Sequence, residues 1–265
     1  MTTSGDVAPS GQRIASCDVW WSAPTGDPRL LELLDETERH RAVRLGCRED
    51  RDRYVTTHAL ARLLLAKRSG EPPARLRFDR TCRRCGASDH GKPRLIGPVV
   101  PFSLAHAGDR VVVAVVGEPA AWLEVGVDVE RVTGPGEVPA TLSPDVLAPA
   151  ELAAYDQLSK HERGHALAMW WTRKESVLKA TGDGLAVPPA DVEVTPPWSP
   201  PALARPVPRP AGSGNPRRAL DPVPATVALH ELDAGADHVG CLAVLGVQTV
   251  RVNERDAGLL LHEAM

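Results

Sequence analysis

The sequence has no surplus of positive charge and few aromatic residues. Its 265 residues carry 34 acidic against 31 basic side chains, a formal charge of −3, so we expect neither nucleic acid nor an anionic membrane as the main partner. Aromatic residues make up 4% of the chain, so its core must be filled mainly by Leu, Val and Ala. This balance still leaves room for a local cationic pocket that holds a small polyanion.

Long apolar runs are also absent. The longest, Val111–Val116, is far shorter than the ~20 residues of a membrane-spanning helix, and residues 1–13 are polar and lack the core of a secretory signal. Five cysteines, an odd number without such a signal, are typical of reduced thiols rather than of a disulfide scaffold. We therefore expect a cytoplasmic protein.

Lysine is the scarcest charged residue, with five lysines against 26 arginines (31 − 5). A site that needs a compact positive charge therefore has few candidates. The five are Lys67, Lys92, Lys160, Lys174 and Lys179.

Strands and helices alternate in two halves of similar size. The patterns predict helices at about 35–45, 51–67, 149–158 and 165–181, and strands at 16–21, 76–78, 110–116, 121–130, 192–194, 226–232 and 238–247. Asp35 and Glu38 have the spacing of a capping box, and Gly182 follows the last helix. This order predicts an α+β fold with an N-terminal lobe at residues 13–120 and a C-terminal lobe at 121–265.

One segment differs sharply in composition. Between Pro196 and Pro224, ten of the 25 prolines fall within 29 residues. Because proline lacks a backbone donor and fixes φ, we expect an extended proline-rich insertion at 196–224 within the C-terminal lobe.

The segment AWLEVGVDVER, residues 121–131, alternates valines with glycine and acids. A strand would bury the valines and present Asp128 and Glu130 together on the opposite face, ~7 Å apart. Two interpretations stay open at this point. The acids face water on a half-exposed strand, or they form part of a site for a hard cation such as Mg²⁺.

The segment WWTRKESVLKATGDGL, residues 170–185, places Trp171, Glu175 and Lys179 on one helix face. On its own this is also typical of an exposed ion pair above an apolar stripe. The alternative is that Glu175 completes a metal site with Asp128 and Glu130, while Lys179 neutralises a phosphate.

Together the two segments resemble the bipartite signature of the 4′-phosphopantetheinyl transferases, G-[VI]-D-[VI]-E followed by W-[ST]-x-K-E-[SA]-x-x-K-x-x-G-x-G-L. The matching positions in the second segment are Trp171, Lys174, Glu175, Ser176, Lys179, Gly182, Gly184 and Leu185. His90–Pro93 resembles the GKP loop of the larger, Sfp-type members. Phe102–His106 resembles their F-N-[IL]-S-H-S segment, with Ser103, Ala105 and Ala107 as departures.

The resemblance implies two pseudo-symmetric α/β lobes with the active site between them, in a monomer that mimics a dimer. It implies a transferase of the holo-[acyl-carrier-protein] synthase type. Such an enzyme moves phosphopantetheine from coenzyme A to a serine of an acyl or peptidyl carrier protein and releases adenosine 3′,5′-bisphosphate. Carriers of fatty acid, polyketide and nonribosomal peptide synthesis all remain open as partners.

The resemblance also implies roles for particular residues. Mg²⁺, with Mn²⁺ as the alternative, would be held by Asp128, Glu130 and Glu175, and Asp128 and Glu175 would be catalytic. Glu175 is the expected base, acting directly or through a metal-bound water. Coenzyme A contacts are expected from Arg41, Arg51, Arg53, Lys92, His106, Lys174 and Lys179, the three arginines being alternatives for the 3′-phosphate.

Three other interpretations compete with this one. His161–His165 spells HERGH, which fits the H-E-x-x-H motif of zinc peptidases, although Gly164 weakens the helix that the motif needs. A coenzyme A-binding or carrier-binding module without activity is the second.

The third is a zinc site, of which Cys82, Cys85 and His90 would be a part. A structural zinc site takes four ligands, and the chain has no second C-x-x-C pair, so two free thiols in a loop are favoured. Only a remote Cys47 or His58 would complete such a site.

Overall fold

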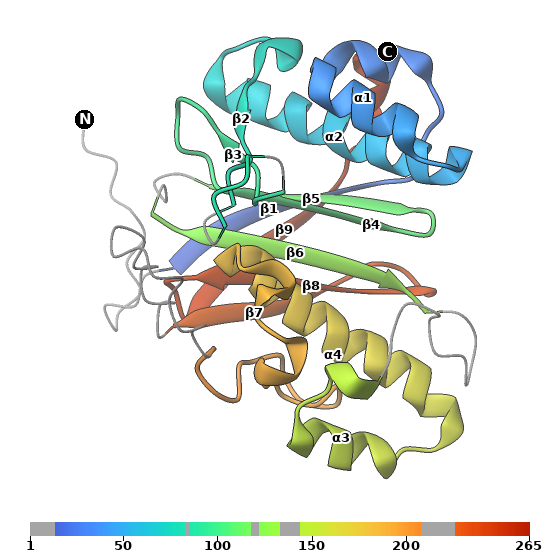
Figure 1. The fold of residues 1–265 in the computed structure, drawn as a ribbon, viewed down its shortest axis with the longest axis vertical. Helices are drawn as coiled ribbons and strands as arrows, with labels where there is room; N and C mark the ends of the chain where they lie inside the picture. Colours follow the sequence, from blue (N-terminus) through green and yellow to red (C-terminus); the bar gives the residue numbers. More distant parts are fainter. Residues whose placement is uncertain (1–13, 83–84, 89, 118–121, 133–143, 208–225) are drawn as a thin grey trace.

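The first sheet is built from both ends of the described chain. In a computed structural model that describes residues 14–82, 85–88, 90–117, 122–132, 144–207 and 226–265, its strands follow the order β4-β5-β1-β9. These are β1 (Ile14–Ser22), β4 (Phe102–Ala107), β5 (Arg110–Val116) and β9 (Thr249–Asp256). Helices α1 (Glu36–Arg44), α2 (Arg48–Ser69) and α5 (Gly258–Glu263) form a layer on one side of this sheet (Figure 1).

The second sheet has the order β6-β8-β7 and is covered by helices on its other side (Figure 1). Its strands are β6 (Glu124–Arg131), β7 (Val227–Leu232) and β8 (His238–Leu245), and its helices are α3 (Pro149–Asp156) and α4 (Lys160–Thr181). A two-stranded ribbon pairs β2 (Phe78–Asp79) with β3 (Arg94–Leu95). Short 3₁₀ turns are η1 (Pro28–Leu33), η2 (Pro73–Arg75), η3 (Pro144–Val146), η4 (Gly184–Ala186) and η5 (Pro189–Asp191).

The two sheets meet along β4 and β6, the edge strands of each. Ser103 on β4 accepts a hydrogen bond of 3.0 Å from the backbone N–H of Val127 on β6, which satisfies a donor that the edge of a sheet would leave unpaired. The valine face of β6 belongs to the same buried apolar cluster as residues of β1 and β5, among them Val19 and Val112. This shared core positions β6 between the two helical layers.

The predicted α+β class with two helix-covered lobes is confirmed. Sequence patterns did not predict β4 or β9, and the predicted strand at 192–194 is reduced to a single bridge between Val194 and Leu203. β9 runs parallel to β1, so residues 249–256 lie in the first sheet although they fall inside the predicted C-terminal lobe. The predicted boundary at 120/121 lies outside the described residues, and the domain division stays a prediction.

The proline-rich segment begins against helix α4. The buried Arg173 donates hydrogen bonds to the carbonyls of Thr195, Pro196 and Ser199, which fixes the start of the segment. Residues 208–224 of the predicted insertion lie outside the described part of the chain.

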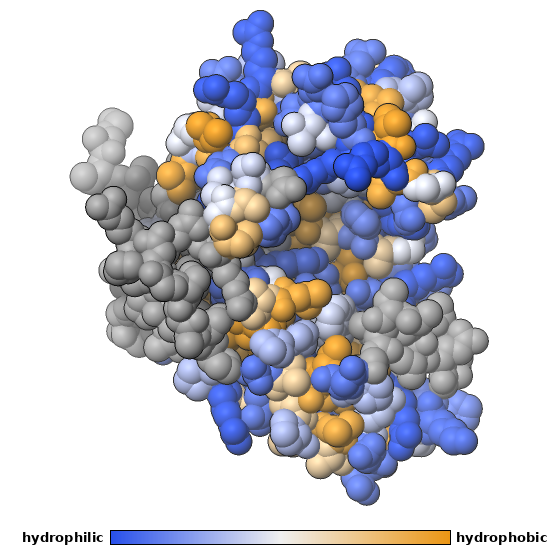
Figure 2. Space-filling model, viewed as in Figure 1, coloured by the Kyte–Doolittle hydropathy of each residue, from blue (hydrophilic) through white to orange (hydrophobic). Residues whose placement is uncertain are grey.

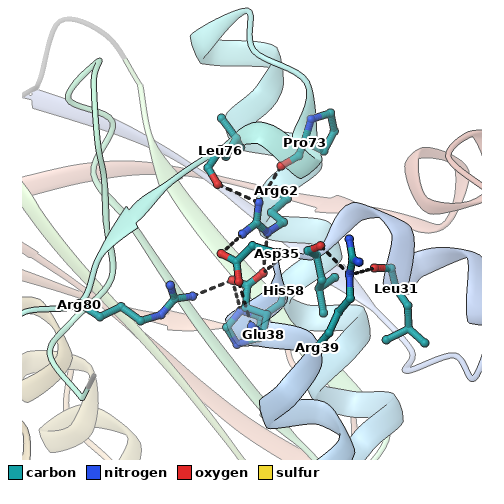
Figure 3. Close-up of polar contacts among 10 residues, drawn as sticks. Leu31, Asp35, Glu38, Arg39, His58, Arg62, Pro73, Leu76 and Arg80 are labelled. Atoms are coloured by element: carbon teal, nitrogen blue, oxygen red, sulfur yellow. Dashed lines mark hydrogen bonds and ion pairs between the residues drawn. The ribbon is translucent and has the colours of Figure 1, made fainter. Parts of the chain in front are cut away.

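A buried network of charges joins α1, α2 and the ribbon (Figure 3). Glu38 is 1% exposed and accepts from the guanidinium groups of Arg62 and Arg80, each at 2.6 Å, while Arg62 also pairs with Asp35. Burial alone would raise the pKa of Glu38, but the hydrogen bonds and charges of His58 and Arg62 lower it to about 2. The predicted capping box of Asp35 and Glu38 is confirmed, and Glu38 serves both purposes.

None of the helices in the described part of the chain is both long and apolar enough to cross a bilayer. In the view of Figure 2, hydrophilic residues cover most of the upper layer, over α1 and α2.

Candidate functional site

Strand β6 carries the two acids of the first motif. Its valines are buried toward the first sheet, and Gly126, Asp128 and Glu130 lie on the opposite face, as the alternation predicts. That face is covered by helix α4 rather than by water, and Asp128 is 4% exposed. The motif therefore presents its acids to a helix.

Gly126 determines how closely the helix approaches. A Cβ atom at this position would lie 1.9 Å from the carbonyl oxygen of Ser176 and 2.4 Å from the amide nitrogen of Ala180. Only glycine lets the α4 backbone lie directly on β6 at this point. This contact places the side chains of α4 above Asp128 and Glu130, which follow Gly126 on the same face of the strand.

Helix α4 faces the strand with Trp171, Glu175 and Lys179, which are spaced one turn apart and half-buried. The Nζ atom of Lys179 lies 2.6 Å from Oδ1 of Asp128. The indole Nε1 of Trp171 donates to Oε1 of Glu130 at 3.0 Å. The structure thus brings together residues that are about 40 to 50 positions apart in the sequence.

We refer to Asp128, Glu130, Glu175 and Lys179 as the acid cluster. It holds three carboxylates against one ammonium group, and the mutual effects of the acids are large. Burial, together with the charges of Asp128 and Glu175, raises the pKa of Glu130 to about 7, against the opposing effects of Trp171 and Lys179. Burial also raises the pKa values of Asp128 and Glu175, although Lys179 acts in the opposite direction on both.

The donor set of the acid cluster fits a hard divalent cation. Oδ2 of Asp128 is buried and has no hydrogen-bond partner in the described chain, which is costly unless another group binds it. Carboxylate oxygens are the ligands that Mg²⁺ prefers in proteins. No set of oxygens from all three acids lies within 4.8 Å of one another in the described chain, so an ion held by all three would have to draw them together.

Two further predicted residues, His106 and Lys92, lie near Lys179 of the acid cluster. Removal from water lowers the pKa of His106 to about 4 despite its exposed edge, and the charges of Lys179 and Arg53 act in the same direction. His106 is therefore neutral at pH 7 in this structure. Lys92 donates to Glu124 at 2.9 Å and to the carbonyls of Val125 and Ala180, so it ties β6 to the end of α4.

The three arginines predicted to contact coenzyme A lie on helices α1 and α2: Arg41 is on α1, and Arg51 and Arg53 are on α2. Arg53 donates to the carbonyl of Gly108 at 3.0 Å and pairs with Asp50. Arg51 is exposed on the first turn of α2 and Arg41 is half-buried near the end of α1. Of the three, Arg53 is the one whose charge acts on His106.

The structure does not bring Lys174 into this group. Lys174 is 0% exposed, pairs with Glu151 at 2.6 Å and donates to the carbonyl of Pro189 at 2.9 Å. Burial lowers its pKa, although Glu151 acts in the opposite direction. Through these contacts Lys174 joins α4 to α3 and η5. The motif lysine therefore has a packing role here.

A cavity of about 610 Å³ adjoins the acid cluster. Lys92, Ser103 and Lys179 line one part of it, and the glycines of the second motif line another. Its size falls within the usual range for small-molecule sites. Of the acid cluster, only Lys179 lines this cavity, so the ammonium group lies between the cavity and the carboxylates.

Sequence reasoning placed Trp171 on the active face but gave it no role. The structure shows its indole holding Glu130, and the spacing of one turn from Glu175 was the signal that could have indicated it. The sequence shows Gly126 only as part of the motif. Its steric role, which is to let α4 approach β6, depends on a helix about 50 residues further along the chain.

The competing zinc-peptidase motif has no site around it. His161 and His165 are exposed on the first turns of α4, and Glu162 completes a capping box with Ser159, accepting from its backbone at 2.9 Å. In the described chain no third metal-ligating side chain joins these histidines.

Comparisons with known proteins agree with the motifs. Residues 124–219 match the family model described as 4′-phosphopantetheinyl transferase superfamily. A 4′-phosphopantetheinyl transferase of Bacillus subtilis is 26% identical over 165 residues, covering 61% of this chain and 66% of that protein. HetI of Nostoc sp. is 26% identical over 199 residues (68% and 79%), and Sfp of Bacillus subtilis is 23% identical over 161 residues (60% and 65%).

The comparison with the first Bacillus subtilis relative thus spans just under two thirds of that protein's length. Among solved structures, a Chronobacterium ammoniagenes ACPS-CoA complex is 24% identical with a TM-score of 0.33, covering 48% of this chain and 98% of that chain. The resemblance to the 4′-phosphopantetheinyl transferase superfamily is thus confirmed over residues 124–219, the part of the chain that the family model matches.

Proposed function

We propose that this protein transfers phosphopantetheine from coenzyme A to a serine of an acyl or peptidyl carrier protein, with Mg²⁺ (or Mn²⁺) as the required ion. Adenosine 3′,5′-bisphosphate is the other product. The observation that carries the proposal is the acid cluster, in which one buried and two half-buried carboxylates lie around one lysine and Oδ2 of Asp128 has no hydrogen-bond partner in the described chain. We further expect a monomeric cytoplasmic enzyme without nucleic acid or membrane partners.

Asp128, Glu130 and Glu175 would hold the divalent ion, which supplies positive charge to the pyrophosphate oxygens when bound. Metal binding requires ionised carboxylates, so Glu130, whose pKa is raised to about 7, would have to be ionised to hold the ion at neutral pH. Trp171 keeps Glu130 turned toward the helix while this happens.

Lys179 stands where the acids meet the cavity, which suits an ammonium group that contacts phosphate. Lys92 lines the same cavity, and the charges of Lys179 and Arg53 both act on His106. A phosphate beside His106 would raise the pKa of its imidazole, so a neutral side chain in the free protein can become a cationic donor on binding. Arg41, Arg51 and Arg53 are the candidates for the 3′-phosphate, and Arg53 has the support of its position.

The chemical step forms a bond between the serine Oγ of the carrier and the phosphorus that bears pantetheine, and it breaks the bond from that phosphorus to the leaving bisphosphate. The serine proton must go to a base. Glu175 is the proposed base, directly or through a water, because burial raises its pKa toward the working pH. Positioning the two reactants in line supplies much of the acceleration.

The test is to incubate the protein with coenzyme A, Mg²⁺ and a panel of apo carrier proteins, and then to measure the mass of each carrier. A gain of one phosphopantetheine group on at least one carrier, lost in the variant Glu175→Gln, supports the proposal. Unchanged masses across the panel, with coenzyme A bound, would indicate a binding module instead.

A further inference from the structure

The loop between β2 and β3 gathers two thiols and an imidazole that the proposed transfer does not use. Ligand atoms of Cys82, Cys85 and His90 all lie within 4.8 Å of one another, and Sγ of Cys85 lies 3.2 Å from Nε2 of His90. This is the one group of three metal-ligating side chains in the described chain. It lies on a wall of the 610 Å³ cavity, which of the acid cluster only Lys179 also lines.

The backbone holds these side chains together. The amide of Cys82 donates to the carbonyl of Ala87 at 2.7 Å, and the amide of Gly86 donates back to the carbonyl of Cys82 at 2.9 Å. The amide of Ala87 also points at Sγ of Cys85, at 3.5 Å. An N–H directed at sulfur stabilises a thiolate, the form of cysteine that binds metals.

The approach of His90 is fixed by the glycine after it. The amide of Gly91 donates to the carbonyl of Arg80 at 2.7 Å, and a Cβ at Gly91 would lie 2.4 Å from the carbonyl oxygen of Thr81. The chain can pass so close only with glycine here. This contact places His90 beside the cysteines that follow Thr81.

The distances suit one ion. In a tetrahedral zinc site, with bonds of about 2.3 Å to sulfur and about 2.0–2.1 Å to nitrogen, neighbouring ligand atoms lie roughly 3.5–3.8 Å apart. Thiolate and imidazole ligands favour zinc over Mg²⁺, which prefers oxygen. Three protein ligands with one open position are typical of zinc sites that keep a water or a substrate atom as fourth ligand.

We propose that Cys82, Cys85 and His90 bind one Zn²⁺ ion whose fourth position faces the cavity. The ion would stiffen the wall of the cavity that precedes Lys92, since His90 and Lys92 are separated by one residue. The site is independent of the acid cluster and of the Mg²⁺ proposed there. In the residues that the structure describes, no fourth protein ligand joins the three, which leaves one coordination position open toward the cavity.

The test measures metal content on the full chain, purified under reducing conditions without chelator, and needs no transfer assay. Elemental analysis should find one zinc per chain in the wild-type protein and a loss of that zinc in Cys85→Ser and in His90→Ala. Cys47→Ser is the matched control, because Cys47 is exposed outside the loop and serine is a good helix N-cap. His161→Ala is the control for the H-E-x-x-H motif. Both controls should keep their zinc.

A second measurement uses the wild-type protein alone, so that it does not depend on the folding of a variant. Replacement of zinc by Co²⁺ should give the thiolate-to-cobalt charge-transfer band and the intense visible bands of tetrahedral cobalt. A wild-type protein that binds no zinc after equilibration with the ion, an octahedral cobalt spectrum, or zinc that persists in both loop variants would each overturn the proposal.

Discussion

The molecule contains two buried groups of charges that differ in balance. Around α1 and α2, the two acids Glu38 and Asp35 face Arg62, Arg80 and His58, and the pKa of Glu38 is lowered to about 2. In the acid cluster, three acids face one lysine, and Glu130 has a pKa of about 7. Burial acts in the same direction in both, so the difference lies in the number of cationic partners.

The comparison teaches what each group is for. A balanced buried network is satisfied within the chain and serves to join α1, α2 and the ribbon. An unbalanced one is costly to the fold and is retained where an external cation completes it. The predictions that follow each disturb one side of this comparison.

The largest effect on stability is expected from Glu38→Gln. The change removes the buried carboxylate that Arg62 and Arg80 share and leaves Asp35 as the remaining acid beside Arg62, and breaking such a buried pair costs about 3–5 kcal/mol of unfolding free energy. Urea unfolding measures this loss. Glu36→Gln on the exposed face of the same helix is the control and should stay within about 0.5 kcal/mol. Equal effects from both would show that the network contributes nothing.

The largest effect on activity is expected from Glu175→Gln. The variant removes one metal ligand and the proposed base, so the transfer rate should fall by at least about 100- to 1000-fold. Its stability should be unchanged or higher, because one of several like charges is gone. Glu162→Gln, on the same helix and in the H-E-x-x-H motif, is the control and should keep full activity. Normal turnover by the Glu175 variant would refute the proposed metal site.

The two groups should also respond oppositely to pH. The pKa of Glu130 is raised from 4.5 to about 7 in the folded protein, so ionising this carboxyl destabilises the fold. The contribution of Glu130 to the free energy of unfolding therefore falls as the pH rises from 4.5 to 7. Glu38 does the reverse, since its pKa is lowered to about 2, and its contribution is lost as pH falls from about 4.5 toward 2. Unfolding at a series of pH values without added Mg²⁺ measures both.

Single variants show which residue causes each change of the unfolding free energy with pH. Glu130→Gln should remove the decline between pH 4.5 and 7 and leave the acid limb as it is. A decline that persists unchanged in this variant would place the titration on another group.

A smaller effect is expected from Lys179→Ala. Loss of one charged hydrogen bond to phosphate should raise the coenzyme A concentration needed for half-maximal rate by about tenfold, with little change at saturation. Initial rates over a range of coenzyme A concentrations measure this shift. Lys160→Ala, at the start of the same helix, is the control. A rate at limiting coenzyme A equal to that of the wild type would count against the phosphate role.

Local patterns predicted much of this structure. The capping box at Asp35, the end of α4 at Gly182 and the alternation of β6 depend on neighbouring residues, and all three are confirmed. The helix face that carries Trp171, Glu175 and Lys179 follows from spacing alone. Proximity of this face to Asp128 came from the resemblance to a known family, since spacing within one segment says nothing of another.

What the sequence could not predict depends on distant contacts. Glu38 is a capping residue by its local pattern, but its ion pairs reach Arg80, 42 positions away. Lys174 and Lys179 both belong to the motif, and only packing against α3 and β6 shows that one is buried in an internal pair. β9 joins β1 across more than 230 residues, a pairing that no short pattern carries.

The central claim is that the three carboxylates of the acid cluster bind one divalent cation together. Binding of Mn²⁺, followed by the loss of its free-ion electron paramagnetic resonance signal at pH 8 in the presence of coenzyme A, tests this most directly. The wild-type protein should bind one Mn²⁺ in competition with Mg²⁺, and Asp128→Asn, Glu130→Gln and Glu175→Gln should each weaken binding by about tenfold or more. Equal affinity in the wild type and all three variants would contradict the account.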